Sequence, residues 1–333
     1  MRRIALLLTL FATALACLLH AVPAQAQPIR VFVALPGADA NPCTFALPCK
    51  SAQHAHDVVA AGGEMRMLDP GSYGLITITK AISILGNGHG GIAASNGATA
   101  ITINAGATDK ISLRGLVIEG FGTGQTGIVF NAGASLTVQD SVIRNFAGDG
   151  IDFLPSLNQF PVIIAASLVV SNTVVSENGG DGVLMKPPSF GSAVEGTFTR
   201  VESRNNAGSG FHGDAFVANS PSVAAIFYNS VVTANGTAGF FANADPANTG
   251  GNSPSVVFEV FQCAVIFNGI NTLFAGSGFK ASGPHAQIRF GGTVVHTLGN
   301  DVVATNGASV LSYGDNYPPP STEVFTEIPG AKQ

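Results

Sequence analysis

The sequence predicts an all-β solenoid, a single-stranded right-handed parallel β-helix with a short N-terminal capping helix. Three observations predict this fold: a motif that recurs about every 30 residues, short strands bounded by Gly and Asn, and no helical periodicity between the strands. Because ordinary parallel sheets need helical crossovers, this pattern excludes a βαβ fold. A repeat of this length cannot bury an apolar face alone, so we expect equivalent strands to stack coil over coil around one core.

The most regular part of the repeat is an alternating strand that ends at asparagine. These strands end at Asn145, Asn178, Asn206, Asn235, Asn268 and Asn300. Equivalent residues of stacked coils lie about 4.8 Å apart, so their side-chain amides can hydrogen-bond along the axis. Asparagine also tolerates the left-handed backbone of a sharp turn. The sequence therefore predicts a column of asparagines at one corner of the coil.

A second element follows each asparagine and consists of Gly and a large apolar residue. It recurs as Gly150-Ile151, Gly182-Val183, Gly210-Phe211, Gly239-Phe240 and Gly278-Phe279. Period-two alternation places the apolar residue inward and the next residue outward. The expected outward column is Asp152, Leu184, His212, Phe241 and Lys280.

The two ends of the chain differ from the repeats. Residues 1–26 have two arginines, an apolar run and Ala24-Gln25-Ala26, the pattern of a cleavable secretory signal, so we expect a secreted or periplasmic protein. Residues 27–66 are expected to hold a first strand, a disulfide loop and a capping helix over 51–61 with Ser51 as N-cap. The β-helix is expected over 67–316, and 317–333 is a Pro-rich tail that we do not expect to extend the ladder.

Cysteine positions suggest one disulfide. Cys43 and Cys49 are close in sequence, and in an oxidising compartment a local disulfide is the natural interpretation. A metal site at this pair would need further ligands at a suitable spacing. Cys263 occupies the repeat position of Ser230 and Thr173, which predicts a small buried residue.

Composition limits the classes of partner. The chain has 15 Lys and Arg against 20 Asp and Glu, a net charge of −5, which argues against a nucleic-acid partner. Charged residues make up 11% of the chain, against about 25% in ordinary domains. The chain instead contains 41 glycines. Beyond residue 26 no apolar stretch approaches the roughly 20 residues of a membrane-spanning helix. The oligomeric state is not readable from the sequence.

Several segments together resemble a known superfamily. They are Val31-Phe32-Val33, Asn41-Pro42-Cys43, Pro48-Cys49, the expected capping helix, the stretch 75–88 and the Asn-Gly coils. From about residue 29 to 316 the chain resembles the pectin-lyase-like right-handed β-helices, in particular exported bacterial members of undefined activity. The resemblance implies the fold and a polysaccharide or cell-surface glycan as partner. It does not choose an activity, because this fold carries lyases, hydrolases, esterases, adhesins and inert scaffolds.

The family's catalytic patterns are not complete in this sequence. The lyase type would need clustered basic and acidic residues in the central coils, and no such cluster is present. Gly88-His89-Gly90 matches one hydrolase motif but lies before the repeats, where a turn residue is expected.

A candidate catalytic set nevertheless emerges when the coils are aligned. Asp149 and Asp181 occupy the same place in successive coils, and two stacked carboxylates can share a proton, bind a cation or act as an acid and base. Asp152, His212 and Asp214 lie nearby in the repeat. The alternative is a turn column, since Asp is also a preferred turn residue.

Four long insertions follow the same strand of successive coils, and loops on one face of a solenoid commonly form the binding surface. Candidate ligand-binding residues on this face are Phe160, Phe190, Phe216, Phe241 and Lys280. The same loops could instead cover apolar positions.

The leading functional hypothesis is an exported scaffold that binds polysaccharide or a surface partner without catalysis. One alternative is a polysaccharide lyase or glycoside hydrolase on the looped face, and another is a structural or adhesive protein. We expect no metal site and no cofactor, with Ca²⁺ required only under the lyase alternative.

Overall fold

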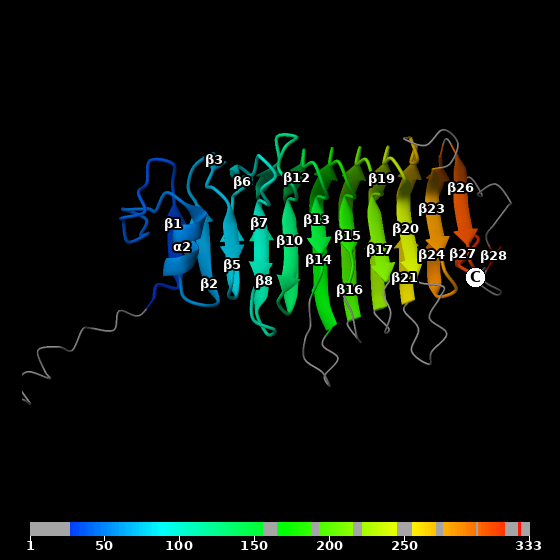
Figure 1. Cartoon of the computed structure of the whole chain (residues 1–333), viewed down its shortest axis with the longest axis horizontal. Helices are drawn as coiled ribbons and strands as arrows, with labels where there is room; N and C mark the ends of the chain where they lie inside the picture. Colours follow the sequence, from blue (N-terminus) through cyan, green and yellow to red (C-terminus); the bar gives the residue numbers. More distant parts are fainter. Residues whose placement is uncertain are drawn as a thin grey trace, which may run out of the picture.

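The structure, a computed structural model, describes residues 27–155, 165–187, 193–215, 222–244, 255–270, 276–297, 299–316 and 326–327. Its strands lie side by side along the long axis of the molecule, in chain order from one end to the other (Figure 1). They form one 19-stranded and one nine-stranded sheet whose pairings are parallel. The predicted parallel β-helix is therefore confirmed.

The coils contribute strands to three faces. The first face contains β1 (Arg30–Val33), β2 (Gly63–Met67), β5 (Ile82–Leu85), β8 (Lys110–Arg114), β11 (Ser135–Gln139), β14 (Ala165–Ser176), β16 (Ala193–Arg204), β18 (Ser222–Tyr228), β21 (Ser255–Phe261), β24 (Ala286–Gly291), β27 (Ser309–Ser312) and β28 (Thr326–Glu327). The second face contains β3 (Gly71–Ser72), β6 (Gly90–Ala93), β9 (Val117–Glu119), β12 (Val142–Arg144), the last residues of β14 and β16, β19 (Val231–Thr233), β22 (Ala264–Ile266) and β25 (Val294–His296). The third face contains β4 (Ile76–Ile78), β7 (Ile101–Asn104), β10 (Ile128–Ala132), β13 (Ile151–Phe153), β15 (Val183–Met185), β17 (Phe211–Ala215), β20 (Ala238–Ala244), β23 (Ser277–Ser282) and β26 (Asn300–Thr305).

The corner between the first and second faces is a left-handed residue. Asp140, Asn172, Arg200 and Asn229 occupy this position with φ between 49° and 53°. Asn and Asp tolerate this conformation, which explains why they recur there. In β14 and β16 the ladder is interrupted only at this residue, so one long strand serves two faces.

The next corner contains the predicted asparagine column. The Asn178 Nδ2 donates to Asn206 Oδ1 at 2.9 Å, Asn206 donates to Asn235 at 3.0 Å, and Asn235 donates to Asn268 at 2.9 Å. All four side chains are buried. Because an unpaired buried amide is costly, each member of this column depends on its neighbours in the adjacent coils.

Two expected members do not belong to the column. Asn145 lies one residue earlier, with φ 59°, and its side chain donates to Glu119 at 2.8 Å. Phe146 stands at the column position instead, and its N–H donates to Asn178 Oδ1. Asn300 begins β26 and pairs with Ser277. The prediction was wrong because the left-handed turn residue and the inward-pointing amide are consecutive positions, and asparagine is suited to both.

The interior is a stack of apolar side chains. The residues that follow the repeated glycines, Ile151, Val183, Phe211, Phe240 and Phe279, are completely buried, as predicted. The rings of the three phenylalanines stack along the axis with centroids 5.3 and 5.5 Å apart. Glycine recurs before them because the next coil leaves no room for a side chain: a Cβ on Gly182 would lie 2.5 Å from Ser203 Oγ, 2.6 Å from the Gly210 carbonyl oxygen and 2.9 Å from Asn206 Nδ2.

Cys263 is a free, buried cysteine. The pairing of Val231 with Ala264 places it beside Ser230, as the repeat alignment predicted. Its Sγ lies 3.2 Å from the carbonyl oxygen of Phe261. Burial raises the pKa of the Cys263 thiol to about 11, so the thiol stays protonated at neutral pH.

The first coil is covered by helix α2 (Ala52–Val58), which lies against the N-terminal strands (Figure 1). Ser51 is the N-cap, as predicted, and its hydroxyl accepts the His54 N–H at 3.2 Å. The helix ends earlier than the expected residue 61, because Val59 has extended backbone with ψ 146°. No helix among the described residues is long and apolar enough to cross a membrane.

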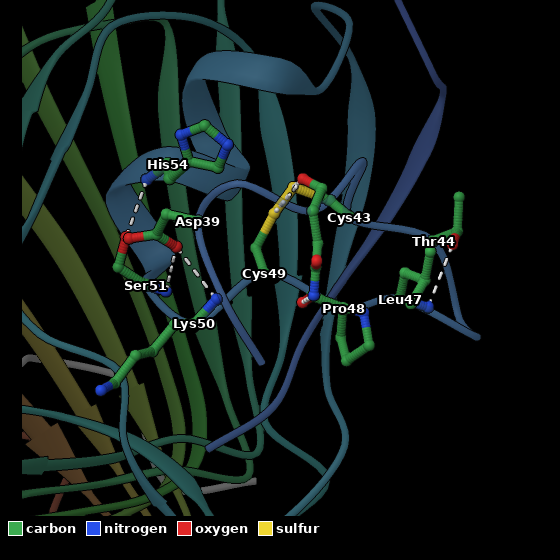
Figure 2. Close-up of a disulfide and its surroundings, with 10 residues drawn as sticks. Asp39, Cys43, Thr44, Leu47, Pro48, Cys49, Lys50, Ser51 and His54 are labelled. Carbon is green, nitrogen blue, oxygen red and sulfur yellow. Dashed lines mark hydrogen bonds between the residues drawn. A yellow bond between two sulfur atoms is a disulfide. The ribbon is translucent and has the colours of Figure 1, made fainter. Parts of the chain in front are cut away.

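The predicted Cys43–Cys49 disulfide is present, with Cα atoms 4.6 Å apart (Figure 2). Asp39 joins this loop to the helix. Its carboxylate accepts the backbone N–H groups of Lys50 and Ser51, both at 2.9 Å, and the Ser51 hydroxyl at 2.8 Å. The loop therefore holds the beginning of α2 in place.

At the other end, β28 pairs with β27 through Leu311–Thr326 and Ser312–Glu327. The segment after residue 316 was not expected to extend the ladder, yet it adds this short strand. Its three prolines, at 318–320, precede the pairing residues and so do not remove the N–H groups that the ladder uses.

Candidate functional site

The candidate site lies on the outer side of the third face. Strand register places Asp152 beside Leu184, Leu184 beside His212, His212 beside Phe241, and Phe241 beside Lys280. This is the predicted outward column, and all five side chains are partly exposed. Successive coils thus place an acid, an imidazole, an aromatic ring and an amine in one row.

Phe241 lies in the middle of this row with both ring faces covered. The His212 ring stacks on one face, with centroids 4.5 Å apart and planes 13° from parallel. The Lys280 ammonium, from the coil on the other side, lies 4.5 Å above the ring centroid. Such cation–π contacts hold an ammonium in place. Phe241 therefore offers its edge to solvent, and a sugar ring cannot stack on its face in this arrangement.

Asp149 and Asp181 precede β13 and β15 and stack as the alignment predicted. The Asp149 Oδ1 accepts the Asp181 N–H at 2.5 Å, and the Asp181 Oδ1 accepts the Ser209 N–H at 2.6 Å. Gly180 makes room for this contact, because a Cβ there would lie 2.0 Å from Asp149 Oδ1. One oxygen of each carboxylate thus joins its coil to the next.

The second oxygen of Asp181 contacts His212. The Asp181 Oδ2 lies 2.7 Å from His212 Nδ1, with side-chain exposures of 16% and 17%. Because a carboxylate only accepts hydrogen bonds, Nδ1 carries a hydrogen, and in the neutral tautomer with this contact Nε2 carries the lone pair. Nε2 is buried and has no hydrogen-bond partner among the described residues. The arrangement is that of an acid that orients a histidine for proton exchange at its other nitrogen.

Asp152 is the group with the most perturbed ionisation at this site. Burial, a hydrogen bond with Asp149 and the negative charges of Asp149 and Asp181 raise its pKa to about 8. Burial and the charge of Asp181 also raise the pKa of Asp149, although its hydrogen bonds with Asp152 and with the Asp181 backbone oppose this. Two carboxyl groups in hydrogen-bonding contact need a shared proton, and Asp152 is the group that holds it at neutral pH.

Asp214, the fifth candidate, has a different set of contacts. It is 7% exposed, and its Oδ2 lies 2.7 Å from the Lys186 ammonium. Asn243 Nδ2 donates to its Oδ1 at 3.1 Å. The three residues form a second polar row, two positions along the strands from the His212 row. Lys186 partly neutralises the buried carboxylate, as a buried charge requires.

Sequence reasoning missed three participants. Lys186 and Asn243 lie two residues after the outward positions of their strands, so extending the period-two alternation would have found them. Thr126 is buried in the coil before Asp149, and its hydroxyl lies 3.5 Å from Asp152 Oδ2. Aligning one further coil, where Gly127 corresponds to Gly150, would have included it.

Three predicted binding residues, Phe160, Phe190 and Phe216, lie outside the described residues. The insertions that contain them all join a third-face strand to a first-face strand, as expected. Among the described residues, the Cys43 and Cys49 sulfurs lie within 4.8 Å of a ring nitrogen of His54. Those sulfurs form the disulfide, so they do not offer the thiolates that metal ions bind.

Comparisons with known proteins define the fold. No family model and no curated protein matches the sequence. Among solved structures, pectate lyase Pel9A is similar with a TM-score of 0.58 and 15% identity, over 88% of this chain and 81% of that chain. A rhamnogalacturonan lyase is similar with a TM-score of 0.36 and 14% identity, over 88% of this chain and 77% of that one. The enzymatically active domain of tailspike protein 2 of bacteriophage CBA120 is similar with a TM-score of 0.46 and 12% identity, over 85% of this chain and 42% of that chain.

At these identities the likeness defines the fold. The chain has the parallel β-helix fold that is also found in pectate lyase Pel9A, and this agrees with the fold that the sequence resemblance implied. A fold of this kind presents rows of side chains along its faces, and the identity of those side chains decides the function.

Proposed function

We propose that this protein is an exported polysaccharide-binding β-helix whose saccharide site lies on the outer side of the third face, from β13 to β23. One observation carries the proposal: Asp181 orients His212, a member of the partly exposed row, and the His212 Nε2 has no hydrogen-bond partner among the residues that the structure describes. Sugar hydroxyls both donate and accept, so they suit a site of few, well-oriented polar groups. The fold of a pectate lyase is consistent with a glycan ligand.

The position of the insertions supports the same face. The predicted insertions, at 154–161, 186–191, 215–221 and 242–254, begin in or just after β13, β15, β17 and β20, the third-face strands of coils that carry the row. Elongated ligands suit a solenoid because equivalent side chains repeat at the coil spacing of about 4.8 Å. A polymer lying along the axis can therefore contact His212 and Lys280 together.

The test is glycan-array and calorimetric binding of the mature chain, with paired histidine variants. We expect His212→Ala to weaken binding about tenfold or more. His296→Ala is the matched control, because His296 also lies near an aromatic ring, that of Phe267, but is on β25 of the second face. The control should bind as the wild type does. No saccharide bound across a broad panel, or equal loss in both variants, would reject the proposal.

Glycoside hydrolysis is the second candidate function, and the raised pKa of Asp152 favours it. A carboxyl that keeps its proton near neutral pH can donate it to a glycosidic oxygen. The catalytic carboxyls of glycosidases stand about 5 to 9.5 Å apart, so Asp149, in hydrogen-bonding contact with Asp152, is too close to be the second one. Asp149 would keep the proton on Asp152, and Asp181 and Asp214 are the candidate carboxylates that remain for the second role.

Hydrolysis is tested by incubating the protein with neutral and acidic polysaccharides and measuring new reducing ends. If the protein is a hydrolase, Asp152→Asn should lower the turnover rate about 100-fold or more, and the variant should still bind the polysaccharide. Unsaturated products with ultraviolet absorbance would instead indicate elimination, the lyase alternative, and their dependence on added Ca²⁺ should then be measured. Unchanged polymers across the panel would remove both catalytic candidates and leave the binding proposal in place.

A further inference from the structure

The N-terminal edge of the third face is strand β4. On one side β4 pairs with β7, through Ile76–Ile101 and Ile78–Ile103. Among the described residues no strand pairs with its other side, toward which the Thr77 and Thr79 N–H groups point. An open edge of this kind is a template for pairing with another chain, so natural sheets cover or block it.

Helix α2 closes this edge with side chains. The Gln53 Oε1 accepts the Thr77 N–H at 2.8 Å, and its Nε2 lies 3.5 Å from the Thr77 carbonyl oxygen. The side-chain amide thus takes the place of a neighbouring strand at Thr77. One turn later along the helix, His56 Nε2 accepts the Thr79 N–H at 3.2 Å. The His56 side chain is only 3% exposed.

The contact with Thr79 fixes the state of the imidazole. An N–H group can only donate, so His56 Nε2 must carry the lone pair and Nδ1 the hydrogen. Nδ1 lies 3.2 Å from Asp57 Oδ1, which also accepts from Gln53 Nε2 at 2.9 Å. The latched arrangement therefore requires a neutral His56.

Two charged groups face this imidazole. Asp57, on the same helix, is an acceptor that favours the imidazolium, and Lys80, just after β4, disfavours it. The Lys80 ammonium is held at the end of the helix by the Val59 carbonyl oxygen, at 2.5 Å. Burial has the largest effect and lowers the pKa of His56, so the neutral form is kept while the helix stays docked.

We propose that His56 is an acid-sensitive latch that holds the capping helix α2 on the edge of β4 and releases it when the imidazole is protonated. A proton on Nε2 sets an N–H group against the N–H of Thr79, so that two donors face each other and the hydrogen bond is lost. The imidazolium is also buried at the interface between helix and strand, where a charge is costly. Release leaves the Thr77 and Thr79 backbone groups open to another strand.

The direction of the pH effect follows from proton binding. In the docked state the pKa of His56 is lowered, and in the released state it returns toward the ordinary value of about 6.5. The released state therefore binds more protons below about pH 6.5. Docking weakens as the pH falls through this range, by up to about tenfold per pH unit, because one proton is taken up on release.

Hydrogen exchange of single amides tests the latch. Protection factors, corrected for the intrinsic pH dependence of exchange, are measured in the full chain at about pH 7.5 and about pH 5. We expect the protection of the Thr79 amide to fall about tenfold or more at the lower pH, and that of Ile103, inside the sheet on β7, to stay constant. Equal Thr79 protection at both pH values would overturn the proposal.

A set of variants separates the latch from general acid instability. His56→Gln places an amide oxygen near the position of Nε2 and accepts at every pH, so it should keep Thr79 protection at about pH 5. His56→Ala should lack it at both pH values. His54→Gln, on the same helix, should follow the wild type. If His56→Gln loses protection on acidification as the wild type does, the proposal is overturned.

The wild-type protein supplies an independent measurement that needs no substitution. Nitrogen-15 spectra of the His56 ring report its tautomer and its titration. The hydrogen should be on Nδ1 at about pH 7.5, and loss of Thr79 protection should follow protonation of Nε2. A ring hydrogen on Nε2 at neutral pH, or protection that disappears without protonation, would contradict the latch.

Discussion

The asparagine column and the third-face row both arise from the stacking of coils, but their side chains differ in chemistry. Both stack equivalent residues of successive coils. Asn178, Asn206 and Asn235 are identical and fully buried, and each amide is paired. Asp152 and His212 stand in a row of unlike residues that is partly exposed, and each has a buried atom that no described residue hydrogen-bonds. The difference teaches that repetition with satisfied hydrogen bonds serves the fold, whereas variation with unsatisfied groups marks a candidate site.

The largest effect on stability is expected from the asparagine column. Asn206→Ala removes the oxygen that accepts the Asn178 backbone N–H and side-chain amide, and it removes one of the two donors to Asn235 Oδ1. It should lower the free energy of unfolding by about 3 kcal/mol. Urea denaturation measures this change. Asn205→Ala is the matched control, because Ala234 stands at the same left-handed position of the next coil, and it should lose less than about 1 kcal/mol. Equal losses would mean that the column is not the stabilising element.

Substitution of Asp152 is expected to have an intermediate effect on stability, and in contrast to Asn206→Ala it should stabilise the folded protein at high pH. The folded protein keeps a proton on Asp152 up to about pH 8, whereas the unfolded chain releases it near pH 4. Wild-type stability should therefore fall as the pH rises from about 4 to about 8, because the folded state binds more protons. Asp152→Asn has no proton to lose at this position, so its stability should depend less on pH. It should exceed the wild type by about 2 kcal/mol near pH 9. Parallel stability curves for the two proteins would contradict the raised pKa.

The smallest effect is expected at the end of the row. Lys280→Met removes the ammonium above Phe241 and should lower the free energy of unfolding by about 0.5 kcal/mol. Lys280→Arg keeps a cation over the ring and should match the wild type in the same denaturation experiment. A large loss in both variants would place Lys280 with the structural columns and not with the site.

Much of this architecture was predictable because each coil repeats the same short-range sequence patterns. The inward apolar positions, the outward row from Asp152 to Lys280, the N-cap at Ser51 and the disulfide all follow from alternation, spacing or capping chemistry, which act over a few residues. The errors occurred where one residue type suits two adjacent positions. Asn145 was misplaced in this way, since a left-handed corner and an inward amide both favour asparagine.

The contacts between coils were not predictable in the same way. That Asp149 accepts the Asp181 N–H, that Asp181 turns its other oxygen to His212, and that Asp152 shares a proton with Asp149 depend on side-chain directions across coils. The covering of both faces of Phe241 likewise depends on which side chains are its neighbours in space. The sequence indicated an aromatic position on the face, and the packing decided that its ring faces are occupied.

By itself the amino-acid sequence determined the winding of the chain, the residues that face the core and the row of side chains that faces outward. Short-range alternation and turn preferences are sufficient for these, because every coil repeats them. The tertiary structure alone decided which polar atoms meet, which proton is retained and how helix α2 closes the edge of β4. Hydrogen bonding and burial depend on distances of a few tenths of an ångström between residues about 30 positions apart, and no local pattern specifies those distances.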